Sequence, residues 1–325
     1  MGSHPPGLTW QLIEAARTRI APFIHTTPVL TSTTLDERAG ARLFFKCENF
    51  QKGGAFKARG ASNAVFGLTE AQACRGVATH SSGNHAAALA RAARLRGIPA
   101  YIVMPQNTPL AKRAAVEREG AIITLCEPTL AARERTAREV MAATGAVLIH
   151  PYDDLTVMAG QATVGVELLE QVADLDIVLA PVSGGGLLSG IAVAAHSMRP
   201  GVRVLGVEPE GADDAARSLR AGKIVPCEHP TTIADGLRAT IGVHPFAEIR
   251  SHVEDIVTVS DAAIVAAMRH IWEVLKIIVE PSGAAAYAAI ASGHAGMRGR
   301  RVGVVLSGGN LDLDSLPWAV TPVRE

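Results

Sequence analysis

The feature that most restricts the possible folds of this chain is a regular alternation between short apolar runs and alanine-rich segments with helical spacing. Each apolar run ends in a polar or glycine-containing loop. The runs predicted as strands are 77–79, 100–104, 121–125, 147–149, 177–181, 202–207 and 302–306. The helices predicted after the first six are 85–95, 110–119, 130–144, 160–172, 187–198 and 215–221. Because strands that alternate with helices of this length pair in parallel and carry helices on both faces, the sequence predicts an α/β fold.

The order of the units predicts two domains. The strand–helix units between 76 and 149 have short connections, so we expect a small domain there, inserted into a larger domain of residues 1–75 and 150–325. The first part contains predicted helices at 10–23, 35–41 and 60–66 and an apolar strand at 43–45, whereas 222–242 has no regular pattern. Ligands of open parallel sheets bind beyond the carboxyl ends of the strands, so the loops there are expected to carry the chemistry.

Composition and charge exclude several classes of protein. The chain of 325 residues has 31 Lys+Arg and 31 Asp+Glu, and this zero net charge argues against broad binding of nucleic acid. It has no apolar run long enough for a membrane span, and its start, MGSHPP, lacks a signal-peptide pattern. The four cysteines are widely spaced, without a metal-finger pattern, and are expected as reduced thiols in a cytoplasmic protein.

The segment ENFQKGGAFKARGA, residues 48–61, places Lys57 beside Phe56 and downstream of a glycine pair. An apolar run precedes it, so Lys57 is expected a short way beyond a strand end. A lysine that loses hydration has a lower pKa, and its neutral amine can form a Schiff base with an aldehyde. The alternative is a solvated lysine at a helix start beside Arg59. The segment alone leaves both readings open.

Two loops at strand ends contain candidate cofactor-binding residues. The stretch from Ser183 to Gly186 joins a strand to a helix, and amides at such a helix start bind anions. The loop has no lysine or arginine and no G-x-G-x-x-G spacing, so it predicts a phosphate cradle made of amides, with a flexible turn as the alternative. Ser307, after the last strand, either hydrogen-bonds a ligand or caps a turn.

Two further loops contain polar residues with two readings each. The loop from Ser81 to His85 can bind a carboxylate at a helix start, or simply cap the helix around a buried histidine. Glu208 and Asp214 offer two carboxylates on one loop, with backbone carbonyls between them. These oxygens suit a hard divalent cation, and the alternative is a solvated acidic loop in which Asp213 or Asp214 caps the next helix.

Over nearly its whole length the sequence resembles the threonine dehydratase and serine racemase group of fold-type-II pyridoxal-phosphate enzymes. The matching stretches, in order, are KGGAFKARGA, HSSGNHAAALA, IHPYDD with AGQATVGVE, PVSGGGLLSGIA, GVEPEGADDA, TIADGLRATIG, VEPSGAAA and VVLSGGNLDL. The resemblance implies two open, mostly parallel, three-layer αβα domains of the tryptophan synthase β-like type. One departure is KGGAFK, where Ala55 replaces the serine of the common KTGSFK.

The resemblance also implies roles for individual residues. Lys57 would carry pyridoxal 5'-phosphate as the internal aldimine, Phe56 would lie against its ring, and Asn84 would hydrogen-bond its 3-hydroxyl. Ser307 would face the pyridine nitrogen and leave it largely unprotonated. The phosphate would be held by Ser183, Gly184, Gly185, Gly186 and Leu187. The substrate carboxylate would be held by Ser81, Ser82, Gly83, Asn84 and His85.

Other features of the resemblance concern the subgroup. Ser82 stands where serine racemases place a second acid/base, opposite Lys57. Glu208, Asp214 and the carbonyl of Ala212 match the site for Mg²⁺, Mn²⁺ or Ca²⁺ of the metal-activated branch, which includes serine racemases and 3-hydroxyaspartate dehydratases. The family implies a homodimer. The chain ends soon after SGGNLDL, so a regulatory domain and feedback by isoleucine are not expected.

We therefore expect β-elimination of a 3-hydroxy amino acid (serine, threonine or 3-hydroxyaspartate) to a 2-oxo acid and ammonia. Serine racemisation, with Ser82 as the second acid/base, is the nearest alternative. For 3-hydroxyaspartate, Arg133 is a candidate partner of the second carboxylate, or else an exposed helix arginine near Glu134 or Glu139. A non-enzymatic anion-binding module using only the glycine loop is the alternative from another class.

Overall fold

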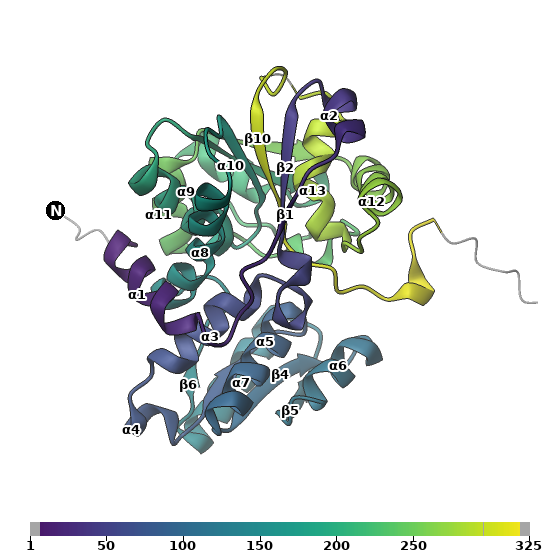
Figure 1. The fold of residues 1–325 in the computed structure, drawn as a ribbon. Coiled ribbons are helices and arrows are strands. Elements are labelled where there is room, and N and C mark those ends of the chain that lie inside the picture. Colours follow the sequence, from purple (N-terminus) through teal and green to yellow (C-terminus); the bar gives the residue numbers. More distant parts are fainter. Residues whose placement is uncertain (1–6, 295, 319–325) are drawn as a thin grey trace, which may run out of the picture.

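The computed structural model describes residues 7–294 and 296–318, so the stretch MGSHPP lies outside the described residues. Its strands form two sheets, seen in the upper and lower halves of Figure 1. The six-stranded sheet has the order β1-β2-β10-β7-β8-β9 and the four-stranded sheet the order β5-β4-β3-β6. The strands are β1 Val29–Leu30, β2 Arg42–Cys47, β3 Val77–Thr79, β4 Ala100–Pro105, β5 Ile122–Cys126, β6 Val147–Leu148, β7 Ile177–Pro181, β8 Arg203–Pro209, β9 Asp255–Val259 and β10 Arg301–Leu306.

Thirteen α-helices surround these sheets in the described part of the chain. They are α1 Trp10–Ile20, α2 Thr33–Ala39, α3 Lys57–Gly67, α4 Glu70–Ala73, α5 Asn84–Arg96, α6 Leu110–Glu117, α7 Leu130–Thr144, α8 Leu155–Gln171, α9 Gly186–Met198, α10 Asp214–Ala221, α11 Val243–His252, α12 Asp261–Leu275 and α13 Pro281–Ala291.

The six-stranded sheet is covered on both faces because successive side chains of a strand point to opposite sides. Leu43 and Phe45 of β2 pack with helices α2, α12 and α13, whereas Phe44 packs with α8, α9 and α11. These two groups of helices lie on opposite sides of the strands in Figure 1. The four-stranded sheet is covered in the same way: α3 and α5 pack in one hydrophobic cluster with its strands, and α7 packs in a second one. The three-layer α/β fold class expected from the sequence is confirmed.

Parallel pairing brings loops distant in sequence to one edge of each sheet. β2 pairs in parallel with β10 from Arg42↔Arg301 to Cys47↔Leu306, and β10 pairs in parallel with β7. The segments that contain Lys57, Ser307 and the glycine loop therefore leave the same edge of the large sheet. β3 pairs in parallel with β6, so the loop from Ser81 and the loop from His150 leave neighbouring strands of the small sheet.

The predicted elements differ from the structure mainly at their ends, and the sequence pattern did not predict β1, β9, α4, α11, α12 or α13. Helix α3 begins at Lys57 and not at Gly60, because Ala55 bridges to Gly308 and the amide of Phe56 donates to the carbonyl of Ser307 at 3.0 Å, which fixes the chain just before the helix. Helix α8 begins at Leu155, where the carboxylate of Asp154 caps it. One strand, β1, pairs antiparallel with β2.

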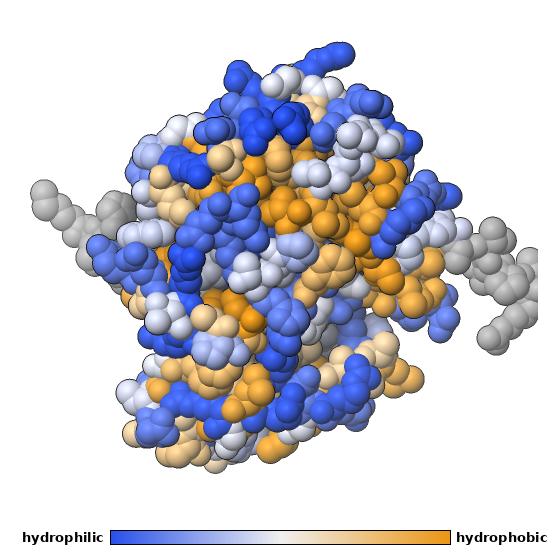
Figure 2. Space-filling view, viewed as in Figure 1, coloured by the Kyte–Doolittle hydropathy of each residue, from blue (hydrophilic) through white to orange (hydrophobic). Residues whose placement is uncertain are grey.

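The surface is mixed, and none of the described helices is long and apolar enough to cross a membrane. Figure 2 shows hydrophilic side chains on both halves and an apolar area on the upper half, toward the side where α12 and α13 lie in Figure 1. The cysteines are free: Cys47 and Cys126 are buried, Cys227 is partly buried and Cys74 is exposed.

Candidate active site

Lys57 is the first residue of α3 and its side chain is partly buried. Its Nζ donates to the carbonyl oxygen of Pro151 at 2.7 Å and lies 5.1 Å from the centroid of the Phe56 ring. Burial removes hydration from the ammonium and lowers its pKa to about 8. The structure therefore favours a partly dehydrated amine over the solvated lysine that the sequence left open.

The glycine loop has the geometry of an anion cradle. Gly185, at φ +91°, is the N-cap of α9, and the amides that follow it open the helix. A Cβ on Gly184 would lie 2.3 Å from the ring of Tyr152, so only glycine fits under this aromatic. The hydroxyl of Ser183 donates to the carbonyl of Ala239 at 3.1 Å and accepts from its amide at 2.9 Å. The Ser183 hydroxyl is thus engaged with the chain, and the amides of the loop, with Leu187 in the first turn, remain the candidate phosphate donors.

The loop after β6 connects Lys57 to the glycine loop. It carries Pro151, which accepts from Lys57, and Tyr152, whose ring lies against Gly184. Nδ1 of His150 accepts from the amide of Asp153 at 2.9 Å, and burial lowers the pKa of His150 to about 4. Asp153 in turn accepts from the amide and the ring of His244 at the start of α11, both at 2.9 Å. Although the sequence placed this loop at a strand end, none of these four residues was expected in the site.

Asn84 belongs to a chain of hydrogen bonds that links both sheets. Its amide nitrogen donates to Glu280 Oε1 at 2.8 Å, and its oxygen accepts from Asn310 at 3.0 Å. Asn310 also donates to the carbonyl of Gly53 at 2.7 Å, four residues before Lys57. Glu280 is buried, and burial is the main reason that its pKa rises to about 8. Sequence reasoning missed Glu280, although a carboxylate directly before a Pro-Ser-Gly helix start was a visible signal.

The other residues expected to bind cofactor or substrate occupy the same region. Ser81, Ser82 and Gly83 precede α5 and are partly buried. The ring of His85 is buried, with Nε2 3.2 Å from the carbonyl of Ile149, so its side chain follows the buried-histidine reading. Ser307 is buried and its hydroxyl donates to the carbonyl of Ser282 at 3.5 Å.

Arg133, on α7, is partly buried, and its Nε has no hydrogen-bond partner among the described residues. Burial is the main reason that the pKa of His80 is lowered, and the positive charge of Arg133 lowers it further. The pKa of Tyr152 is raised, mainly by burial, and the charge of Arg133 opposes that rise. Glu134 and Glu139 pair with Arg138 and Arg135 instead. Arg133 is thus near these glutamates, as one reading had it, but it is partly buried and pairs with neither of them.

The two carboxylates proposed for a cation lie at the start of α10. Glu208 accepts from the amides of Ala216 at 2.6 Å and Ala215 at 3.3 Å, and Asp214 accepts from the amide of Ile241 at 2.9 Å. Both are buried, and mainly for that reason the pKa of Glu208 rises to about 8 and that of Asp214 to about 6. Asp214 Oδ1 is buried without a hydrogen-bond partner among the described residues.

These features fit a divalent cation, which would satisfy the unpaired oxygen and stabilise both ionised carboxylates. In the described part of the chain no three His, Cys, Asp or Glu side chains gather as a ligand set. Backbone carbonyls, such as that of Ala212, would have to complete the coordination.

Comparison with known proteins connects this geometry to a family. Residues 20–308 match the family model described as "Pyridoxal-phosphate dependent enzyme". The chain is 52% identical over 310 residues to a beta-hydroxyaspartate dehydratase of Paracoccus denitrificans, with 95% of this chain and 98% of the relative covered. It is 50% identical over 319 residues to a serine racemase of Oryza sativa subsp. indica, covering 97% and 94%. The solved structure of maize serine racemase superposes with a TM-score of 0.93 at 48% identity, with 95% of each chain covered.

Proposed function

The chain belongs to the family of pyridoxal-phosphate dependent enzymes, and we propose that it catalyses the β-elimination of a 3-hydroxy amino acid. The products are a 2-oxo acid and ammonia. The observation that carries the proposal is the Lys57 amine, which has a pKa lowered to about 8 and donates to Pro151, the neighbour of the Tyr152 whose ring lies against Gly184 of the glycine loop. The chain's relatives include a dehydratase and serine racemases, which supports chemistry at the Cα of an amino acid.

In this proposal each part of the chain has a separate task. When bound, pyridoxal phosphate supplies a conjugated ring that withdraws electrons from Cα. Amides from Ser183 to Leu187 hold its phosphate, and Asn84 orients it through the hydrogen bond to Glu280. Lys57 attaches the cofactor and, once the substrate has displaced it, takes the Cα proton, a task that needs an amine with a depressed pKa. The α5 start from Ser81 binds the substrate carboxylate.

Replacing Lys57 tests the proposal directly. We expect Lys57→Ala to abolish both the visible absorbance band of the bound cofactor and turnover, because no other side chain supplies the amine. Absorbance spectra and ammonia release would be measured on the purified variant. A variant that keeps both signals would refute the assignment, and a colourless wild-type protein would instead favour the anion-binding module.

Among the hydroxy amino acids, we propose 3-hydroxyaspartate as the substrate that uses Arg133. The unpartnered guanidinium Nε and the influence of its charge on His80 and Tyr152 support a negatively charged group there. The same amino acid is named for the relative from Paracoccus denitrificans.

The substrate assignment is tested by kcat/KM for serine, threonine and both 3-hydroxyaspartate diastereomers. We expect Arg133→Leu to lower kcat/KM for 3-hydroxyaspartate by roughly 10–100-fold, because a charge-assisted hydrogen bond is lost, and to change that for serine by less than about threefold. Arg135→Leu, on the same helix but paired with Glu139, is the matched control. Equal losses for both substrates would contradict the assignment.

Serine racemisation is the second candidate, favoured by the similarity to serine racemases and by Ser82 at the start of α5. If Ser82 delivers a proton to the second face of Cα, Ser82→Ala should lose racemisation by at least about tenfold and keep elimination. Chiral chromatography of serine beside a pyruvate assay would measure both. Equal loss of the two activities would argue against this role.

The remaining inferences concern metal, assembly and compartment. A cation (Mg²⁺, Mn²⁺ or Ca²⁺) at Glu208, Asp214 and Ala212 is supported by the unpaired Asp214 oxygen. A homodimer is proposed from the resemblance to the family alone. Four free cysteines agree with a reducing, cytoplasmic location.

A further inference from the structure

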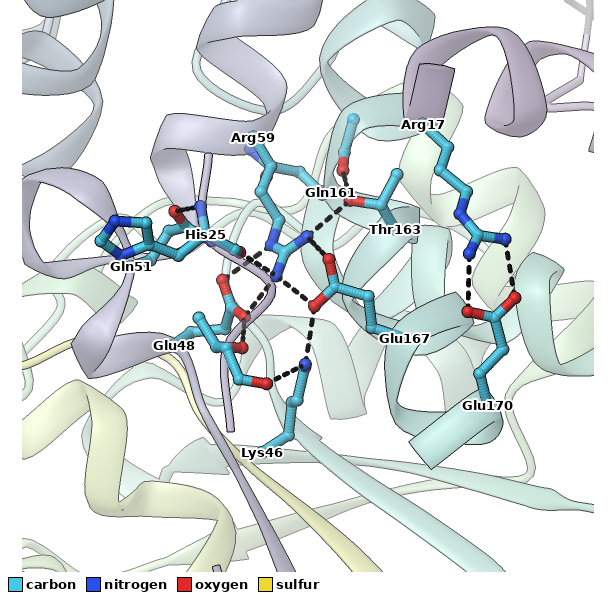
Figure 3. A network of polar contacts seen from close by, with 12 residues as sticks. Arg17, His25, Lys46, Glu48, Gln51, Arg59, Gln161, Thr163, Glu167 and Glu170 are labelled. Carbon is cyan, nitrogen blue, oxygen red and sulfur yellow. Dashed lines mark hydrogen bonds and ion pairs between the residues drawn. The ribbon is translucent and has the colours of Figure 1, made fainter. Parts of the chain in front are cut away.

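A buried network of four charged residues, one of them two positions after Lys57, is not used by the proposed chemistry (Figure 3). Lys46, Glu48 and Arg59 are fully buried, and Glu167 is 9% exposed. From the sequence, Arg59 was named only as a neighbour of Lys57, in the reading in which that lysine is solvated. Two cations and two anions make the network neutral, as buried charges require.

Arg59 lies at the centre of the network and both edges of its guanidinium are occupied. Nε and one terminal nitrogen donate to the two oxygens of Glu48, each at 2.8 Å. The two terminal nitrogens donate to the two oxygens of Glu167 at 2.7 and 2.8 Å. Thr163 accepts a further bond at 3.0 Å. Paired bonds of this kind fix both the distance and the orientation of the planar guanidinium.

The partners of Arg59 come from different elements. Glu48 follows β2, Arg59 is in the first turn of α3, and Thr163 and Glu167 are on α8. The backbones of α3 and α8 also touch, since a Cβ on Gly160 would lie 2.6 Å from the Cα of Gly60. The amide of Gly60 donates to Gln161 at 3.2 Å. The first turn of α3 is therefore held against α8 on the side of Arg59.

Lys57 lies in the same helical turn, but its side chain contacts a different part of the molecule. Residues two apart on a helix do not face each other, so Lys57 leaves the turn in a different direction from Arg59. Its Nζ reaches Pro151, in the loop that leads into α8. Arg59 therefore bonds to residues within α8, whereas Lys57 bonds to the loop that precedes α8.

We propose that Arg59 is a positioning residue for Lys57: held between Glu48 and Glu167, it fixes the first turn of α3 against α8 and so sets where the Lys57 amine lies relative to the loop at Pro151. The inference rests on the proposed function, because it assigns Arg59 a role through the lysine that binds the cofactor. Arg59 acts through the backbone and contacts neither substrate nor cofactor.

Arg59→Lys tests the inference, since it keeps the charge and removes the planar fork. We expect the full-length chain, freed of cofactor and given pyridoxal phosphate at pH 8, to recover its visible band at least about tenfold more slowly, because a displaced amine meets the aldehyde less often. In the holoenzyme kcat should fall by roughly 10–100-fold, while KM changes by less than about threefold.

Lys46→Met is the matched control. It removes the other buried cation, whose Nζ donates to Glu167 at 2.7 Å, and leaves both carboxylates on Arg59. Lys46 is on β2 and does not hold α3. We expect the melting temperature of the Lys46→Met variant to fall, because a buried ion pair is broken. The rate of band recovery and kcat should stay within about threefold of wild type.

The possible outcomes separate this inference from the proposed function. Equal slowing in Arg59→Lys and Lys46→Met at similar melting temperatures, or a normal recovery rate in Arg59→Lys, would overturn the positioning role and leave the Lys57 assignment intact. Loss of the band in Lys57→Ala is the separate test of that assignment. If Arg59→Lys does not fold, Glu48→Gln, which weakens one edge of the fork, should slow recovery in the same direction, and an unchanged rate would overturn the inference.

Discussion

At the scale of single residues, burial moves the pKa values of two titratable groups of the site in opposite directions. Burial lowers the pKa of Lys57 to about 8 and raises that of Glu280 to about 8. At neutral pH Glu280 is therefore protonated while Lys57 keeps a usable neutral fraction. Glu280 holds Asn84, and Asn84 with Asn310 leads back to the segment before Lys57. A neutral Glu280 would thus orient Asn84 without adding a negative charge beside the ring that Asn84 is proposed to contact.

Replacing Glu280 tests its protonation state. Because its folded-state pKa is raised from 4.5, the stability linked to its proton is present below about pH 4.5 and is lost as the pH rises through about 8. Glu280→Gln keeps a neutral acceptor for Asn84, so its melting temperature in saturating Mg²⁺ should fall less between pH 6 and 9 than that of wild type.

The activities of two variants complete this test. At pH 7 kcat should stay within about threefold in Glu280→Gln and fall at least about tenfold in Glu280→Ala, in which the partly buried amide of Asn84 loses its acceptor. If Glu280→Gln retained the full pH dependence of stability, Glu280 would not be the group that titrates.

At the scale of elements, helix starts supply most of the candidate binding groups. The first amides of α9 are the proposed phosphate donors, α5 begins at Asn84, and α10 begins at Asp214 with the carboxylate of Glu208 on two of its first amides. Helix N-termini suit anions because their first amides lack partners within the helix. At α10 these amides hold Glu208 buried next to Asp214, and each rise in pKa records the cost of ionising a carboxyl there.

Removing divalent cations should therefore have a pH-dependent effect. Without a cation, the stability contributed by the proton of Asp214 is lost as the pH rises through about 6, and that contributed by the proton of Glu208 as it rises through about 8. A cation replaces these protons, so we expect Mg²⁺ to raise the melting temperature by a few degrees at pH 8 and by less at pH 5.5. Thermal denaturation with EDTA or Mg²⁺ measures this.

The control for the cation is Asp214→Asn, which keeps the size of the side chain and removes a charge. Its melting temperature should respond to Mg²⁺ much less than that of wild type at pH 8. A response that is equal at both pH values, or equal in the variant, would argue against a cation between Glu208 and Asp214.

At the scale of the whole molecule, strand order decides which loops meet. β2 comes early in the chain and β10 near its end, yet they are neighbours over six residue pairs. This pairing places the segment of Lys57 beside Ser307, and the next strand, β7, adds the glycine loop. The small sheet contributes the loops after β3 and β6. Segments from both sheets also meet where Lys112 of α6 pairs with Asp235, beside Glu280.

Much of this could be predicted from the sequence because it depends on local patterns. Apolar runs and helical spacing gave most strands and helices between 77 and 221, and the boundaries of β7 and α7 agree with the prediction. The position of loops at strand ends predicted where the chemistry lies, and the family motifs named Lys57. The start of α3 at Lys57 was missed because a bridge to Gly308, far along the chain, sets it.

Only the tertiary structure decided how the charged residues are used. Arg59 and Glu167 are 108 positions apart and Asn84 and Glu280 are 196 positions apart, so no local pattern connects them. Spacing along a sequence reports which face of an element is apolar, whereas the pKa of Lys57, the protonation of Glu280 and the neutral network around Arg59 depend on burial and on partners from distant segments. The sequence by itself predicted the fold class, most elements between 77 and 221 and, through the family motifs, the candidate lysine, whereas the packing of the two sheets determined the environment in which that lysine lies.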